Sequence, residues 1–182
     1  MQKRLVELRA KWKAENRPQL KMRIGLCTGS AVVGNMGSKN RMDYTMMGTT
    51  VNIAARLEGV NKVYGTYTMI SGATYIAAEG EIFARELDSI NVVGKEEPVV
   101  VYEVLVYHGR IDEKLMSVVN QYAEGLSAYR NQNWDEAINH FSAALSAAPH
   151  DAPSQTMLKR CGDFKVRPPG KDWDGVYIAK EK

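Results

Sequence analysis

The pattern of hydrophobic and polar positions changes twice along the chain. Leu5, Leu8 and Trp12 recur at helical spacing with charged residues between them, which predicts a helix. This helix should end before Pro18, because the residue that precedes proline is pushed out of helical geometry. From residue 22 onward, short β-rich runs alternate with glycine. The predicted strands are residues 22–28, 31–36, 44–47, 67–70, 82–93 and 98–107, and two helices at 50–64 and 71–78 interrupt them.

Beyond residue 109 the strand signals stop and three helices follow. They are predicted at 113–130, 134–148 and 152–164. Asn133 with Glu136 three places later predicts a capping box at the start of the middle helix, and Pro149 should close that helix. The last residues predict an extended tail that lays Trp173 and Tyr177 on another surface.

These elements divide the chain into four segments of different character. The division is a basic amphipathic helix at 1–20, a mixed α+β segment at 21–108, an all-α segment at 109–165 and an extended tail at 166–182. We therefore expect an α+β protein with a separate, small helical part.

Composition excludes several classes. The chain has 182 residues, of which 45% are hydrophobic and 25% charged, with a net charge of +3, as in globular proteins of one or two domains. No apolar stretch approaches the roughly 20 residues that span a bilayer, and the basic N-terminus is not followed by the apolar run of a secretory signal. Cys27 and Cys161 lie far apart without C-x-x-C spacing, which favours a reduced, cytoplasmic location.

The charge is unevenly distributed. Residues 1–23 contain eight Lys or Arg against two Glu, so they carry +6 and the remainder carries −3. Such a segment could bind nucleic acid or an anionic membrane surface. The solvated face of an ordinary packed helix explains it better, so no nucleic acid partner is expected, and membrane association is expected only through segments upstream of this chain.

A P-loop nucleotide site is not supported. The run from Gly29 to Gly34 has the glycine spacing of a P-loop, but Asn35 and Met36 stand where Lys and Ser or Thr must bind phosphate and magnesium. We interpret Gly29 as the turn of a hairpin between two strands, with Gly34 and Gly37 at a bend after the second strand.

Hydrolytic and metal-dependent sites of common type also lack support. The three histidines are scattered without metal-ligand spacing, at positions 108, 140 and 150. Neither a G-x-S-x-G elbow nor an H-E-x-x-H motif is present, so hydrolase and zinc-protease functions have no motif behind them.

Four motifs follow one another between residues 25 and 58. They are Gly25-Leu-Cys-Thr-Gly29, Gly34-Asn-Met-Gly37-Ser38, Arg41-Met-Asp43-Tyr44-Thr45 and Gly48-Thr-Thr-Val51-Asn52-Ile-Ala-Ala-Arg56-Leu57-Glu58. In this order they resemble the class III nucleotidyl cyclases, the adenylate and guanylate cyclases. The resemblance continues in Glu86-Leu-Asp88, Gly94-Lys95, Glu97-Pro98 and Tyr102-Glu103-Val104 and covers about residues 20–107. It implies that residues 21–108 are the C-terminal portion of a ferredoxin-like cyclase domain.

Asn52 and Arg56 are the leading candidates for catalysis. They lie four residues apart on a predicted helix that begins near Thr49 or Thr50, both good N-cap types, so they project from one face. Arg56 could there stabilise charge that develops at phosphorus. An amphipathic helix with two exposed polar residues is the plainer alternative. The resemblance implies that Asn52 positions the ribose and Arg56 stabilises the pentavalent transition state as the 3′-hydroxyl attacks the α-phosphorus and pyrophosphate leaves.

The resemblance also implies substrate contacts. Thr45 stands at the family's purine-selecting position, where threonine is similar to the adenylate cyclases, so ATP is the expected substrate; a plain β-branched strand residue is the alternative. The lysine that the family places on the triphosphate falls on Val93, so that contact is lost or passes to Lys95. Thr49 is a further departure, because the family often has aspartate there.

In the family two ions, Mg²⁺ or Mn²⁺, are held by two aspartates that lie upstream of the strand with Gly25, on segments this chain lacks. The isolated chain is therefore expected to be inactive, with no metal ligand of its own. The resemblance implies head-to-tail dimers in which Thr45, Asn52 and Arg56 serve a site completed by the partner. An unpaired sheet edge would also favour a homodimer or higher self-association.

The helical segment resembles one tetratricopeptide repeat. The residues that carry this resemblance are Gly125, Ala137, Phe141, Ala144 and Pro149. A lone repeat buries little surface, so we expect it to dock on the cyclase domain or on a neighbouring subunit. Asp172-Trp-Asp-Gly175 resembles the ends of membrane-anchored, sensor-coupled bacterial cyclases. The leading hypothesis is the C-terminal part of an adenylate cyclase; the alternative, which Val93 favours, is a cyclase-like pseudoenzyme or scaffold that acts through the helical repeat.

Overall fold

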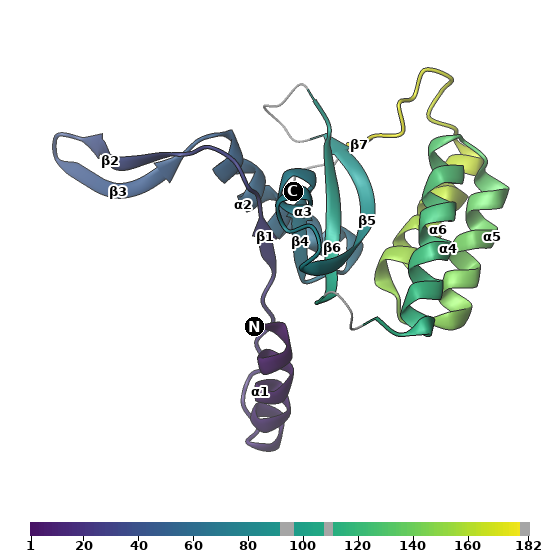
Figure 1. Cartoon of the computed structure of the whole chain (residues 1–182), viewed down its shortest axis with the longest axis horizontal. Helices are drawn as coiled ribbons and strands as arrows, with labels where there is room; N and C mark the ends of the chain where they lie inside the picture. Colours follow the sequence, from purple (N-terminus) through teal and green to yellow (C-terminus); the bar gives the residue numbers. More distant parts are fainter. Residues whose placement is uncertain (92–96, 108–110, 179–182) are drawn as a thin grey trace.

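A computed structural model describes residues 1–91, 97–107 and 111–178 and has an α+β architecture (Figure 1). Its centre is a five-stranded sheet in the order β1-β4-β6-β5-β7. The strands are β1 (Ile24–Leu26), β4 (Thr68–Ser71), β5 (Ile82–Asn91), β6 (Val99–Tyr107) and β7 (Tyr177–Ile178). Among the described residues, no helix is both long and apolar enough to cross a membrane.

Helix α2 (Thr49–Tyr64) connects the two parallel strands β1 and β4 and packs on the sheet. Strands β4, β6 and β5 then pair antiparallel, with the short helix α3 (Gly72–Ala77) between β4 and β5. Parallel neighbours need a crossover connection, and α2 supplies it. The fold therefore fixes α2 directly over the strands that it joins.

Strand β7 is an element that the sequence did not predict. The tail was expected to lie extended on a surface, and Trp173 does pack against the aromatic rings of Tyr129, Trp134 and Phe164. Beyond it, Tyr177 pairs with Ile90, so the tail adds a parallel edge strand to β5. Two residues are too few to show a periodic pattern in the sequence.

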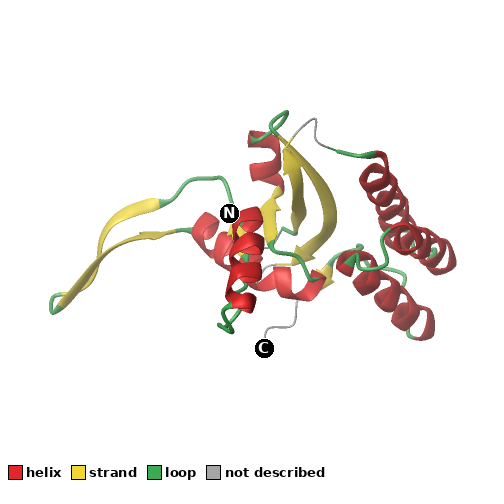
Figure 2. Ribbon diagram, turned by 90° about the horizontal axis from the view of Figure 1, so that it is seen from below, coloured by secondary structure: helices red, strands yellow, loops and turns green. Residues whose placement is uncertain are grey.

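The second sheet is a two-stranded arm formed by β2 (Val32–Ser38) and β3 (Arg41–Met47). It projects from the body on the side opposite the C-terminal helices (Figures 1 and 2). The predicted hairpin turn at Gly29 is wrong, because β1 pairs with β4 and the true turn lies at residues 39–40. Gly37 has a φ of +146°, and a Cβ there would lie 2.1 Å from the Arg41 carbonyl oxygen, so the strand needs glycine beside the turn.

Helix α1 (Gln2–Ala14) ends before Pro18, as predicted, and none of its residues is fully buried. Figure 1 shows it pointing away from the sheet. The Gln2 side-chain amide donates to the Met22 carbonyl at 3.0 Å and ties the start of the helix to the segment before β1. The apolar face of α1 is thus only partly covered in this chain.

Three C-terminal helices, α4 (Glu113–Arg130), α5 (Trp134–Ala147) and α6 (Ala152–Val166), confirm the predicted positions closely. The ring of Phe141 lies so near Gly125 that a Cβ there would be 2.9 Å from it, so glycine lets α4 and α5 approach closely at this point. Kinship with tetratricopeptide repeats remains a prediction. The capping box is wrong: the Asn133 side chain makes no bond to the backbone and instead donates to the Glu136 carboxylate at 3.3 Å.

The helices share one hydrophobic core with the sheet. Leu57 of α2, Leu87 of β5 and Tyr122 of α4 are all fully buried within it. The Tyr122 hydroxyl donates to the Leu87 carbonyl at 2.9 Å, which joins α4 to the sheet by a buried hydrogen bond. The helical segment is therefore docked on the α+β part of the same chain.

Candidate active site

Helix α2 lies unusually close to β1, and a single glycine permits this. A Cβ at Gly25 would lie 2.2 Å from the carbonyl oxygen of Ala54 and 2.5 Å from the amide nitrogen of Glu58. No real Cβ atom is found at such distances, so only glycine allows the middle of α2 to rest on the strand. Gly25, the first glycine of the cyclase-like motifs, is therefore required for the packing of α2 on β1.

A buried asparagine fixes the same contact nearer the C-terminal end of α2. The side chain of Asn61 donates to the carbonyl oxygens of Ile24 at 3.1 Å and Leu57 at 2.8 Å, and its own oxygen accepts a hydrogen bond from the Thr66 hydroxyl. Buried polar groups must be paired, and here the pairing ties the helix to the strand and to the following turn. Asn61 carried no signal in the sequence beyond its place in the helix.

The N-terminal half of α2 carries the two candidate catalytic residues. Asn52 is exposed and Arg56 half-buried, one turn apart on the same face, as predicted. The predicted N-cap at Thr49 or Thr50 is wrong: the cap is Gly48, with a φ of +142° and no capping side chain. A backbone turn that only glycine adopts readily takes the chain from the arm into the helix, so no hydroxyl is needed to start it.

Thr45 lies on strand β3 of the arm, opposite Gly34, and is exposed. Since side chains alternate along a strand, Thr45 shares a face with Val32 and Met47, whereas Met42, Tyr44 and Met46 point to the opposite face. Lys95, with Val93 and Gly94, lies outside the described residues. The structure therefore places Thr45, Asn52 and Arg56 on two consecutive elements joined at Gly48.

The described residues contain no ready metal site. Within 1–91, 97–107 and 111–178, no three His, Cys, Asp or Glu side chains lie together as a metal-binding group. The two ions that the sequence resemblance implies therefore have no ligand group among the described residues. No step of a reaction is assigned to a metal ligand of this chain.

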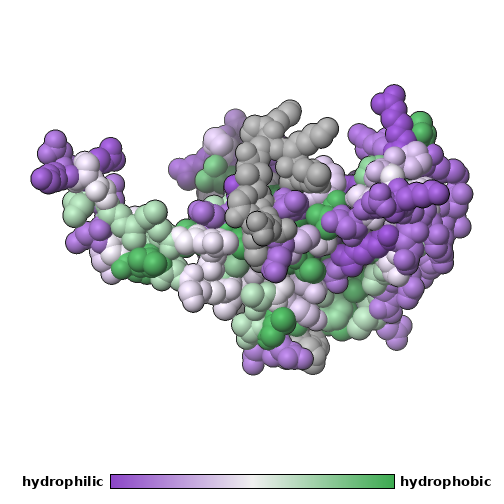
Figure 3. All heavy atoms as spheres, turned by 90° about the horizontal axis from the view of Figure 1, so that it is seen from above, coloured by the Kyte–Doolittle hydropathy of each residue, from purple (hydrophilic) through white to green (hydrophobic). Residues whose placement is uncertain are grey.

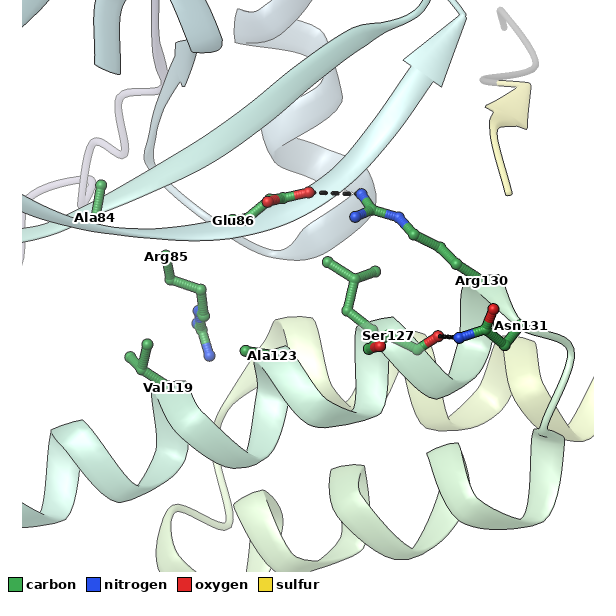
Figure 4. Close-up of a pocket in the computed structure, with 9 residues that line it drawn as sticks. Ala84, Arg85, Glu86, Val119, Ala123, Ser127, Arg130 and Asn131 are labelled. Carbon is green, nitrogen blue, oxygen red and sulfur yellow. Dashed lines mark hydrogen bonds and ion pairs between the residues drawn. The ribbon is translucent and has the colours of Figure 1, made fainter. Parts of the chain in front are cut away.

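A cleft of about 400 Å³ lies elsewhere, between β5 and α4, and contains none of the three candidate residues (Figure 4). Three of its polar side chains have partners: Arg130 forms an ion pair with Glu86 at 2.6 Å, and the Asn131 side chain donates to the Ser127 carbonyl at 3.0 Å. Val119 and Ala123 form an apolar wall on α4. The cleft is a seam between sheet and helix rather than a substrate site.

Sequence reasoning missed a set of buried ion pairs behind this seam. Arg85 of β5 is 3% exposed and binds both Glu103 of β6, at 2.5 Å, and Asp151 at the start of α6, at 2.9 Å. Burial raises the pKa of Glu103, although Arg85 opposes the rise, whereas at Asp151 the hydrogen bonds and charge of Arg85 outweigh burial and lower the pKa. These partners are far apart in sequence, so no local pattern reveals them.

The chain is similar to known proteins mainly in its α+β part. The family profile of the adenylate and guanylate cyclase catalytic domain matches residues 1–105. The terminal-differentiation specific adenylate cyclase of Dictyostelium discoideum is 32% identical over 144 residues, and adenylate cyclase 1 of Rhizobium meliloti (strain 1021) is 39% identical over 105 residues. These alignments cover 76% and 58% of this chain.

The chain is similar to a solved cyclase structure in both sequence and fold. The adenylyl cyclase CyaB from P. aeruginosa is 33% identical, with a TM-score of 0.51 over 60% of this chain and 56% of that one. The chain spans only 7% of the Dictyostelium relative and 16% of the Rhizobium relative. The Dictyostelium alignment is too long to stop at residue 105, so it includes part of the C-terminal helices.

Proposed function

Because the chain belongs to the adenylate and guanylate cyclase catalytic-domain family, we propose that it supplies the ribose-binding and transition-state residues of an enzyme that converts ATP to cyclic AMP and pyrophosphate. The observation that carries this proposal is helix α2, which presents Asn52 and Arg56 together on one face. Gly25 and Asn61 hold that helix rigidly on β1. Fixed positions are what a reaction dominated by orientation and charge stabilisation requires.

In this reaction the ribose 3′-hydroxyl oxygen forms a bond to the α-phosphorus and gives up its proton to solvent water. The bond from the α-phosphorus to the oxygen that bridges to the β-phosphate breaks, and pyrophosphate leaves. The guanidinium of Arg56 stabilises the negative charge that grows on the phosphoryl oxygens. Asn52 offers an amide donor and acceptor that orient the ribose.

We propose ATP rather than GTP as the substrate, with Thr45 as the residue that contacts the purine. Its hydroxyl both donates and accepts hydrogen bonds, and it lies on the face of the arm opposite the Met42, Tyr44 and Met46 stripe. The two curated relatives and the similar solved structure are each called an adenylate or adenylyl cyclase. Cyclases of this family generally use divalent metal ions, for which we propose ligands upstream of this chain.

The arm supports self-association. Tyr44 is 76% exposed, Met42 60% and Met46 56%, and cross-strand pairing adds Val33 to the same face. Figure 3 shows apolar residues gathered along the arm, and a monomeric protein rarely exposes such a stripe. We infer that this face meets a second copy while the Thr45 face turns to the nucleotide.

The arm variant Met42→Ser/Tyr44→Ser/Met46→Ser tests this inference by sedimentation equilibrium of an N-terminally extended protein that contains the whole cyclase domain. Dimerisation should weaken at least tenfold, whereas Val32→Ser on the other face should leave it unchanged. Equal behaviour of the two variants would mean that the stripe is not the contact.

The catalytic role of Arg56 is tested in the same extended protein, with Arg56→Ala against the control Lys62→Ala. Both variants remove one positive charge from α2, but Lys62 lies exposed in the last turn. Loss of Arg56 should lower kcat by about 10²- to 10³-fold, or about 3 to 4 kcal/mol of transition-state stabilisation, and loss of Lys62 by less than about twofold. Unchanged turnover in Arg56→Ala would remove this residue from the mechanism.

A further inference from the structure

The C-terminal end of α2 is held by α6, a helix that comes 90 residues later in the chain. The Thr156 hydroxyl donates to the Val63 carbonyl at 3.3 Å, across a separation of 93 residues. A Cβ at Gly65, the left-handed residue that ends α2, would lie 2.5 Å from the Cβ of Ala152. The two helices therefore meet without room for a larger residue at the point where α2 ends.

A buried charge cluster lies behind this contact. Arg160 of α6 donates to one carboxylate oxygen of Asp88 on β5 at 2.6 Å, and the Tyr64 hydroxyl of α2 donates to the same oxygen at 2.6 Å. The second Arg160 amino group lies 3.4 Å from the Tyr64 hydroxyl. Asp88 and Tyr64 are fully buried and Arg160 is 8% exposed. One guanidinium thus joins three elements: α6, β5 and the last residue of α2.

The cluster is closed by the tail. The Arg160 guanidinium lies 3.6 Å from the ring centroid of Tyr177 in β7 and also faces the rings of Tyr64 and Tyr129. Aromatic faces attract a guanidinium and hold its plane in one orientation. Burial raises the pKa of Asp88 and the positive charge of Arg160 opposes that rise, so the carboxylate depends on Arg160 for its charge.

A movement at one end of α2 is transmitted to its other end, because the helix touches β1 near its middle. The helix is about 24 Å long, and Gly25 touches it near the middle, at Ala54 and Glu58. Tyr64 lies about 12 Å from that contact in one direction and Asn52 about 6 Å in the other. A 1 Å displacement at Tyr64 would therefore move Asn52 by about 0.5 Å, which is the tolerance within which catalytic groups must be held.

We propose that the helical segment clamps α2 and that Arg160 is a positioning residue, which sets Asn52 for cyclisation by fixing the far end of its helix. This proposal rests on the proposed function, since it assigns to the helices the alignment of Asn52 in the same site. It also gives the C-terminal helices a role within the chain.

Kinetics of the extended protein provide the first test, with Arg160→Gln against the matched control Arg85→Gln. Both variants break a buried ion pair between the sheet and α6, but within the part of the chain that the structure describes Arg85 pairs with Glu103 and Asp151 and not with α2. Arg160→Gln should lower kcat by about 10-fold or more with KM for ATP within about twofold. Arg85→Gln should leave kcat within about twofold at a similar loss of stability, and Arg160→Lys should restore part of the activity.

Hydrogen exchange of the chain described here provides a test that does not need catalysis. Arg160→Gln should speed exchange of the α2 amides from residue 53 to 64, whereas Arg85→Gln should leave them at the wild-type rate. If Arg160→Gln does not fold, Tyr64→Phe removes only the hydroxyl and should show the same pattern at smaller size.

The two tests separate the two proposals. An inactive wild-type extended protein would contradict the proposed function, and faster α2 exchange in Arg160→Gln would still support the clamp. Unchanged α2 exchange in Arg160→Gln, or an equal fall of kcat in Arg160→Gln and Arg85→Gln, would overturn the clamp while the cyclase function stands.

Discussion

Replacing Gly25 by alanine tests the contact that places α2 on the sheet. The added Cβ would lie 2.2 Å from the Ala54 oxygen, whereas ordinary contacts begin at 3.4 Å, so the helix must withdraw by about 1 Å. The obstructing atoms are the Ala54 oxygen, the Glu58 amide nitrogen and the Leu57 Cβ, and none of them can rotate away. We expect a loss of about 3 kcal/mol, at the upper end of overpacking costs, which corresponds to a fall of about 6 to 12 °C in Tm.

Gly59→Ala is the matched control, because it makes the same chemical change in the helix that Gly25 touches. Among the described residues, no atom beyond its chain neighbours and the backbone of α2 itself lies within 4 Å of a Cβ at Gly59, so this variant should gain up to about 1 kcal/mol from the higher helix propensity of alanine. Thermal and urea unfolding of the chain, followed by far-UV circular dichroism, give both values. A Gly25→Ala variant as stable as Gly59→Ala would refute the close approach of α2 and β1, and with it the argument that this contact positions Asn52 and Arg56.

Three further predictions concern stability. Phe141→Ala should cost about 3 to 5 kcal/mol, because the fully buried ring fills the space above Gly125; a loss below about 1 kcal/mol in urea unfolding would contradict this packing. Arg130→Gln should cost less than about 1 kcal/mol, since its ion pair with Glu86 is one-third exposed, and a larger loss would show that the pair matters more than its exposure implies. In Arg160→Gln, the free energy of unfolding should fall as the pH rises above about 3.8, because native Asp88 keeps a proton that the unfolded chain releases; a second substitution, Asp88→Asn, should remove this slope. The other titratable groups that face Asp88 are Tyr64 of α2 and Tyr122 and Tyr129 of α4, whose pKa values burial raises further from neutrality.

The sequence predicted those elements whose pattern is local. Helix α2 follows from its apolar positions, and the same spacing correctly placed Asn52 and Arg56 on one face. The prediction of the arm was wrong because a glycine marks a possible turn but does not determine which strands pair. Strand β1 pairs with β4, which follows α2, and the hairpin is formed instead by β2 and β3.

Long-range charge pairs lay beyond prediction. Arg160 and Asp88 are separated by 72 residues, and Arg85 and Asp151 by 66, so nothing near either residue indicates its partner. In the sequence, Asp88 stands out only as part of a family motif. Its role follows from the structure, in which Tyr64 of α2 and Arg160 of α6 both donate to it. The start of α2 near Thr49 was predicted correctly, but its capping residue was not, because two suitable hydroxyl residues stand beside a glycine whose backbone conformation decides the cap.

The most direct test of the proposed cyclase function is the product formed by the N-terminally extended protein when it is supplied with manganese and either ATP or GTP. We expect cyclic AMP from ATP, little or no cyclic GMP from GTP, and loss of product in Arg56→Ala. A folded, dimeric protein that forms neither product would contradict the proposed function, and the chain would then act as a cyclase-like interaction module.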